Sequence, residues 1–165
     1  MPDDVYLGNP NLKKANTAIE FTQEQILEFV KCKDDPVYFA KNYVKIVSLD
    51  EGLVPFKPYD FQEKLINRFH ENRFNICKMP RQTGKSTTCV SYLLHYAIFN
   101  DSVNIGILAN KAATARELLG RLQTAYENLP KWMQQGIMVW NKGSLELENG
   151  SKILAASTSA SAVRG

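Results

Sequence analysis

Cysteine and long apolar runs are scarce in this sequence, and a secretory start is missing. The three cysteines, Cys32, Cys77 and Cys89, are odd in number and widely separated, with no pair at metal-ligand or redox spacing. This pattern excludes a disulfide framework and is typical of buried thiols in a reducing compartment. The longest apolar stretch, residues 92–99, is interrupted by His95, and the first residues are acidic and polar. We therefore expect neither secretion nor a membrane span.

A large excess of one charge is also lacking. The net charge is +3 over 165 residues, which is too small to indicate nucleic-acid binding unless the charges cluster. Hydrophobic residues make up 44% of the chain, enough to bury one core. The length allows one domain, or one domain with a small appendage.

In the first third of the chain, the sequence indicates only two short helices. Residues 1–20 have no periodicity, so we expect a loose arm. Thr22 and Gln25 form a capping box at the start of a helix. Asp35-Pro36 predicts the start of a second helix, because Asp caps well and Pro suits the first helical position.

Two prolines mark a boundary between this part and the rest. Pro55 and Pro58 cannot continue a helix or donate to a sheet. We therefore expect an arm and small helical subdomain over residues 1–55 and a separate core over residues 56–165.

The core predicts an α/β fold. The expected order is a helix capped by Asp60 and Glu63, then a strand, a helix, a strand and a helix, over residues 60–69, 74–79, 87–99, 102–109 and 115–129. Alternating strands and helices favour a parallel sheet. Residues 145–154 alternate about Asn149-Gly150, which predicts a β-hairpin with a type I′ turn.

One loop in the core indicates a chemistry. The stretch "MPRQTGKSTT", residues 79–88, ends like a phosphate-binding loop, but Met79 stands where the first glycine belongs. The preceding strand, the following helix and Gly84-Lys85-Ser86 meet the other requirements, and Pro80 can set the backbone instead. Lys85 would bind phosphate and Ser86 would coordinate Mg²⁺. The alternative is a chance Gly-Lys-Ser.

Two further side chains allow two interpretations each. Arg81, inside the loop, could stabilise charge on a transferring phosphoryl group or pair with a surface carboxylate. Gln62 begins a helix that ends just before the loop strand, and its amide could read an adenine edge. Its alternative is an exposed helical glutamine.

Several segments together resemble a known family, the terminase large subunits of contractile-tailed bacteriophages, in their N-terminal ATPase region. The resemblance rests on "YDFQEKL", "ICKMPRQTGKST", "IGILANKAATARELLGRL", "LPKWMQQGIMVWNKGSLELENGS" and "SASAVRG". It implies a P-loop NTPase of the ASCE, helicase-like class, with helices flanking a parallel sheet. It also implies that ATP and Mg²⁺ bind, with Gln62 in the adenine motif, Arg81 and Lys85 catalytic, Ser86 at the metal, and a phosphate-binding set of Arg81, Gln82, Thr83, Gly84, Lys85, Ser86 and Thr87.

The resemblance also implies partners and a place of action. These motors package double-stranded viral DNA into proheads, act in the host cell cytoplasm, and meet a portal protein and a small terminase subunit. A full-length subunit would form a homo-oligomeric ring on the portal. No membrane is expected among its partners. A helicase-like or restriction-type DNA translocase, or a truncated nucleotide-binding product without catalysis, stays an alternative.

An acidic pair upstream of the loop imitates a catalytic motif. Asp50-Glu51 follow an apolar run, but they precede the loop, whereas the family has its catalytic carboxylates after it, so we interpret them as turn residues. The family's carboxylate strand and nuclease domain would follow Gly165. The resemblance therefore implies an incomplete core that binds ATP weakly without turning it over, with Arg164 as a residue that responds to nucleotide.

Overall fold

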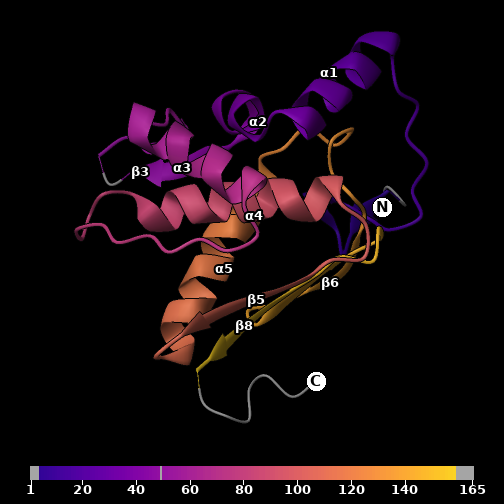
Figure 1. The fold of residues 1–165 in the computed structure, drawn as a ribbon. Helices are drawn as coiled ribbons and strands as arrows, with labels where there is room; N and C mark the ends of the chain where they lie inside the picture. The colour runs from indigo at the N-terminus through magenta and orange to yellow at the C-terminus, as the bar shows by residue number, and fades with distance from the viewer. Residues whose placement is uncertain (1–3, 49, 159–165) are drawn as a thin grey trace.

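Helices pack over a β-sheet in the structure, a computed structural model that describes residues 4–48 and 50–158 (Figure 1). The helices in these residues are α1 (Gln23–Asp34), α2 (Pro36–Tyr43), α3 (Asp60–Glu71), α4 (Lys85–Phe99) and α5 (Ala112–Glu127). The strands are β1 (Val5–Tyr6), β2 (Asn9–Lys13), β3 (Lys45–Ser48), β4 (Gly52–Pro55), β5 (Asn104–Ala109), β6 (Ile137–Trp140), β7 (Ser144–Leu147) and β8 (Lys152–Ser157). Within the described residues, no helix is both long and apolar enough to cross a membrane.

The main sheet has the strand order β5-β8-β7-β6. Strands β5 and β8 run parallel, with Gly106 opposite Leu154, while β7 is antiparallel to both β8 and β6. The predicted α/β class is therefore confirmed, but the expectation of a parallel sheet is wrong because the sheet is mixed. The hairpin between β7 and β8 reverses the chain within the sheet, and a reversal by a short loop can only join antiparallel strands.

The predicted strand over residues 74–79 does not form. This segment is irregular, and Phe74 and Ile76 are 82% and 99% exposed. A strand is stabilised by hydrogen bonds to a neighbouring strand and by burial of one face. Among the described residues, nothing pairs with this segment, so its apolar composition alone does not produce a strand.

The hairpin around Asn149-Gly150 is confirmed, but its predicted turn type is wrong. The Gly150 N–H donates to the Leu147 carbonyl at 3.0 Å, and the Leu147 N–H donates to Ser151 at 2.9 Å. Gly150 has a left-handed φ of 81°, whereas Asn149 does not. A type I′ turn needs both residues left-handed, so this is a three-residue loop, residues 148–150, closed by glycine.

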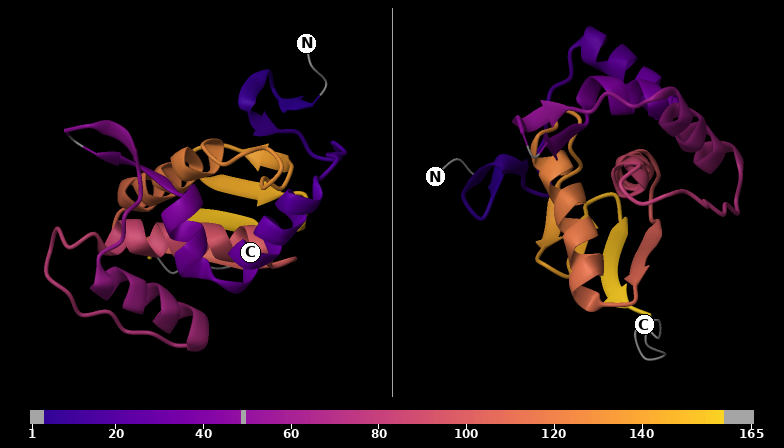
Figure 2. Two further views of the ribbon diagram at one scale, coloured as in Figure 1. Left: turned by 90° about the horizontal axis from the view of Figure 1, so that it is seen from above. Right: turned by 90° about the vertical axis from the view of Figure 1, so that its left-hand side faces the viewer.

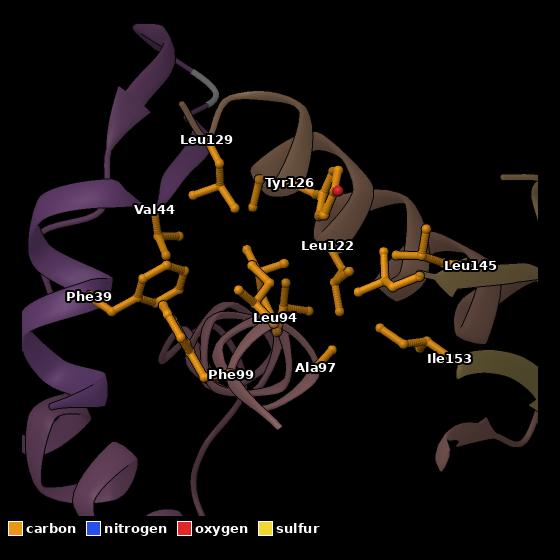
Figure 3. Packing of buried hydrophobic residues seen from close by; sticks show 14 of the residues in the cluster. Phe39, Val44, Leu94, Ala97, Phe99, Leu122, Tyr126, Leu129, Leu145 and Ile153 are labelled. Carbon is orange, nitrogen blue, oxygen red and sulfur yellow. The ribbon is translucent and has the colours of Figure 1, made fainter. Parts of the chain in front are cut away.

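The core lies where α4 is enclosed by α5, the helices α2 and α3, and one face of the sheet (Figure 2). Figure 3 shows Leu94 of α4 surrounded by side chains of the neighbouring elements. Among them are Phe39 of α2, Leu122 and Tyr126 of α5, and Ile153 of β8, all 2% exposed or less. This packing holds α4 in the core, and the candidate loop leads into the N-terminus of that helix.

The opposite face of the sheet is open among the described residues. Leu108 of β5, Met138 of β6 and Leu154 of β8 are 47%, 55% and 51% exposed. Their strand neighbours Ile107, Ile137 and Ile153 are buried against the helices, as the alternation of side chains along a strand requires.

The described part of the N-terminal arm contains two paired strands, β1 and β2, contrary to the expectation of a loose arm. Leu7 and Gly8 have φ values of 47° and 78° and turn the chain between β1 and β2. The buried Leu12 joins the core, and the Lys13 N–H donates to the Gln134 side chain at 2.9 Å. Because these contacts span more than a hundred residues, no local pattern in residues 1–20 could predict them.

The predicted helix starts are confirmed for α1 and α2. The Thr22 hydroxyl accepts from the Gln25 N–H, and the Gln25 side chain accepts from the Thr22 N–H. Asp35 caps α2 at Val37 and Tyr38.

The predicted cap of α3 is wrong by one position. Tyr59 is the cap residue, and its N–H donates to the side chain of Gln62 rather than Glu63. Glu63 instead pairs with Lys41 at 2.6 Å. The proposed division at residue 55 stays a prediction.

Candidate functional site

The loop of residues 79–86 delivers backbone N–H groups to one end of α4. Gly84 caps the helix in a left-handed conformation with φ 73°, and Thr88 is the residue whose N–H first bonds back, to the Gly84 carbonyl at 2.9 Å. The N–H groups of Lys85, Ser86 and Thr87 therefore have no partner within the helix. Their dipoles make this end attractive to an anion.

A second left-handed residue lies two positions before the glycine. Gln82 has φ 59°, which costs a non-glycine residue about 1–2 kcal/mol. Such strained residues persist only where the surrounding structure holds them in place. They cluster at active sites and ligand-binding sites. Gln82 and Gly84 thus give this short loop two left-handed residues separated by Thr83.

Lys85 folds back over the loop. Its Nζ donates to the carbonyls of Met79 at 2.8 Å and Pro80 at 2.5 Å. Thr83 Oγ1 donates to the same Pro80 carbonyl at 3.1 Å. Lys85 forms no ion pair with any carboxylate in the described residues, so its positive charge is not neutralised by a neighbouring acidic side chain.

The loop borders a cavity of about 450 Å³. The charged side chains that line it are all basic: Arg81 and Lys85 from the loop, and Arg121 from α5. The remaining lining residues are polar or glycine, namely Gln82, Thr83, Gly84, Ser86 and Thr87. Three basic side chains beside a helix N-terminus, with no acidic lining residue among those described, are an arrangement suited to a polyanion.

A larger cavity of about 660 Å³ lies between the end of α3, α4 and β5. Its lining carries charges of both signs, Glu71 and Arg73, and the rings of Phe69 and Tyr92. It lacks the convergent cations and free N–H groups of the smaller cavity. Size alone therefore does not identify the binding site here.

Gln62 lies behind the loop and is only 4% exposed. Its Oε1 accepts from the Tyr59 N–H at 2.9 Å, and its Nε2 donates to the Thr83 carbonyl at 3.3 Å. A side chain at Gly84 would collide with the same Nε2. Gln62 thus connects the start of α3 to the loop.

Asp50 and Glu51 lie in the turn between β3 and β4, as predicted, and both are exposed. They do not line the loop cavity. Arg164 lies outside the described residues.

The structure brings the seven predicted loop residues together around one cavity and places Gln62 against them. It adds Arg121, which sequence reasoning missed. The signal available for Arg121 was its spacing of four from Glu117 on a predicted helix, and this spacing is common on solvent-exposed faces.

A comparison with known families agrees with this location. Residues 76–165, more than half of the chain, match the family described as terminase large subunit, T4likevirus-type, N-terminal. The match includes the loop, α4, α5 and the strands of the main sheet.

Proposed function

The chain belongs to the family of T4-like terminase large subunits, and we propose that it is the ATP-binding part of a motor that packages viral DNA. The observation that carries this proposal is the loop cavity. Its charged lining residues are Arg81, Lys85 and Arg121, and the N-terminus of α4 opens beside them. Convergent cations and free backbone N–H groups are what a nucleotide polyphosphate requires.

Each predicted site residue has a role in this proposal. Lys85 exchanges its two carbonyl partners for phosphate oxygens, and the exposed hydroxyl of Ser86 contributes a ligand to Mg²⁺, the cation that accompanies ATP. Arg81 faces the cavity and stabilises negative charge on the phosphates. Gln62 reads the adenine, and Gln82, Thr83, Gly84 and Thr87 complete the loop around the phosphates.

The wider role follows from the family. Terminase large subunits serve in DNA packaging, and we propose that this chain acts in the same machinery, on double-stranded viral DNA in the host cell. Its partners in that machinery would be a portal protein, a small terminase subunit and further copies of itself. A P-loop NTPase fold remains part of the proposal: the loop leads into α4 beside a mixed sheet, although residues 74–79 before it form no strand.

Nucleotide binding tests the proposal directly. We expect the purified 165-residue chain to bind ATP with Mg²⁺ in a calorimetric titration, and Lys85→Ala to weaken binding by on the order of 100-fold, because the charge-assisted contacts are lost. Lys78→Ala is the matched control, since Lys78 is exposed beside the loop and does not line the cavity. Equal affinities for Lys85→Ala and the unaltered chain would overturn the assignment of the loop.

Phosphate release should be measured in the same samples. Hydrolysis needs a carboxylate that orients the attacking water, and the charged residues described around the cavity are all basic. We therefore expect binding with little turnover. Turnover that Lys85→Ala abolishes would make Glu51 the first carboxylate to mutate.

A further inference from the structure

Arg121 differs from the other residues of the loop cavity because it comes from another element. The loop and the first turn of α4 supply the rest of the lining, whereas Arg121 lies on α5. Arg121 and Thr87 also line an adjoining cavity of about 720 Å³ between β3, α4 and α5. Arg121 therefore stands where the two cavities meet, across from the loop.

The present partner of Arg121 is Glu117, one helical turn earlier. Arg121 Nη2 lies 2.7 Å from Glu117 Oε1, and the two side chains are 51% and 62% exposed. Exposed ion pairs of this kind contribute little to stability and are screened by salt. Glu117 lines the adjoining cavity but not the loop cavity.

A polyphosphate is a stronger partner than this carboxylate. It carries several negative charges, and a guanidinium can donate two parallel hydrogen bonds to phosphate oxygens. Lys85 and Arg81 approach the cavity from the loop, and Arg121 approaches from α5.

We propose that Arg121 is a phosphate-binding residue that leaves Glu117 when a nucleotide enters the loop cavity. The inference rests on the proposed nucleotide site and adds a contact from α5 to it. Through this contact, a bound nucleotide would connect the loop to α5, which packs on β5 and β8.

The experiment compares ATP titrations of the 165-residue chain and its variants. We expect Arg121→Gln to weaken ATP about tenfold, the loss expected for one charge-assisted contact. The ATP affinity of Arg121→Lys should lie between those of the unaltered chain and Arg121→Gln, because lysine keeps the positive charge but cannot donate two parallel hydrogen bonds. Arg116→Gln is the control, since Arg116 is exposed on the same helix and lines neither cavity.

Glu117→Gln provides an independent measurement. Removing the competing carboxylate should tighten ATP about twofold, in line with a weak surface pair. This gain should vanish in the double variant with Arg121→Gln. An Arg121 that only supports the fold would not produce this coupling between the two variants. If Arg121→Gln lowers the melting temperature, the ATP affinities of Arg121→Lys and Glu117→Gln still test whether Arg121 binds phosphate.

The outcomes separate the two proposals. Loss of ATP binding in Lys85→Ala, with equal affinities for Arg121→Gln and Arg116→Gln, would overturn the role of Arg121 and leave the nucleotide site standing. If the unaltered chain binds no nucleotide, both proposals fail.

Discussion

Two loops of this protein each contain a glycine with a left-handed backbone conformation, but the contacts around the two loops differ. Gly84 in the candidate loop (residues 79–86) and Gly150 in the hairpin loop (residues 148–150) have φ values of 73° and 81°. Beside Gly150, the Asn149 side chain donates to the carbonyl of Ala97 at 2.9 Å. The Ser151 hydroxyl likewise donates to Asn100 at 2.8 Å.

The side chains of Asn149 and Ser151 thus bond to carbonyls of the α4 end, whereas the backbone N–H groups of Lys85, Ser86 and Thr87 have no partner within the helix and lie beside a cavity. Polar groups that are paired inside a protein stabilise its fold, because leaving them buried and unpaired is costly. Cations and N–H groups directed at a cavity do not contribute in this way, and they fit an external ligand. The same backbone turn is therefore structural in one place and a candidate binding site in the other.

The largest expected effect in the hairpin loop comes from Glu148. Its carboxylate accepts hydrogen bonds from the N–H groups of Gly136 at 2.6 Å and Asn16 at 2.9 Å, and pairs with Lys13 at 3.0 Å. We expect Glu148→Gln to lower the free energy of unfolding by about 2 kcal/mol at pH 7, because bonds to a charged group are lost. Urea denaturation measures this. Glu146→Gln, which breaks an exposed pair with Lys152 at 3.3 Å, is the control and should cost little.

The contribution of Glu148 to the free energy of unfolding should also depend on pH. Partial burial opposes ionisation of Glu148, but the contacts from Gly136, Asn16 and Lys13 outweigh it and lower the pKa below the usual value of 4.5. A lowered folded pKa means that the stabilisation is complete above pH 4.5 and is lost as the pH falls through the folded value. The difference between the unaltered chain and Glu148→Gln should therefore shrink below pH 4.5. A difference that stays constant down to pH 3 would contradict this role.

A matched pair of glycine substitutions sharpens the comparison. Alanine at either position is strained by about 1–2 kcal/mol, because φ stays positive. At Gly150 the new methyl group would also lie 2.9 Å from Ser102 Oγ, so Gly150→Ala should lower the melting temperature and leave ATP affinity unchanged. Gly84→Ala would press on Gln62 and should reduce ATP affinity. If both variants changed affinity equally, the distinction between the two loops would be wrong.

The smallest expected effect concerns Gln62. If its amide reads adenine, Gln62→Ala should weaken ATP several-fold more than GTP, a difference of about 1 kcal/mol. The existing bond from Gln62 to the Thr83 carbonyl is long at 3.3 Å, so it can be exchanged for a base at modest cost. Parallel titrations with the two nucleotides measure this. An equal loss for both would assign Gln62 to supporting the loop alone.

Local sequence signals predicted much of the candidate site. The residues from Arg81 to Thr87 are consecutive, so the loop and helix that hold them are set by short-range chemistry. Glycine at position 84 permits the left-handed turn, and α4 follows from its pattern of apolar residues. The helix caps of α1 and α2 and the Asn149-Gly150 hairpin are local in the same sense.

Contacts between distant residues were outside the reach of those signals. Residues 74–79 have a strand-like composition, yet a strand also needs a neighbour to pair with. Lys13 and Asn16 of the arm bond to Gln134 and Glu148, which are more than a hundred residues away. Arg121 enters the loop cavity because α5 packs beside α4, and its helical spacing alone does not distinguish it from a surface residue.

The sequence by itself thus determined the α/β class, the starts of α1 and α2 and the hairpin at Asn149-Gly150, because propensity, capping and glycine geometry act over a few residues. Only the tertiary structure decided the mixed sheet, the burial of Gln62 behind the loop and the third cation of the cavity. These depend on which elements pack together, and packing is set by the joint burial of apolar faces across the whole chain.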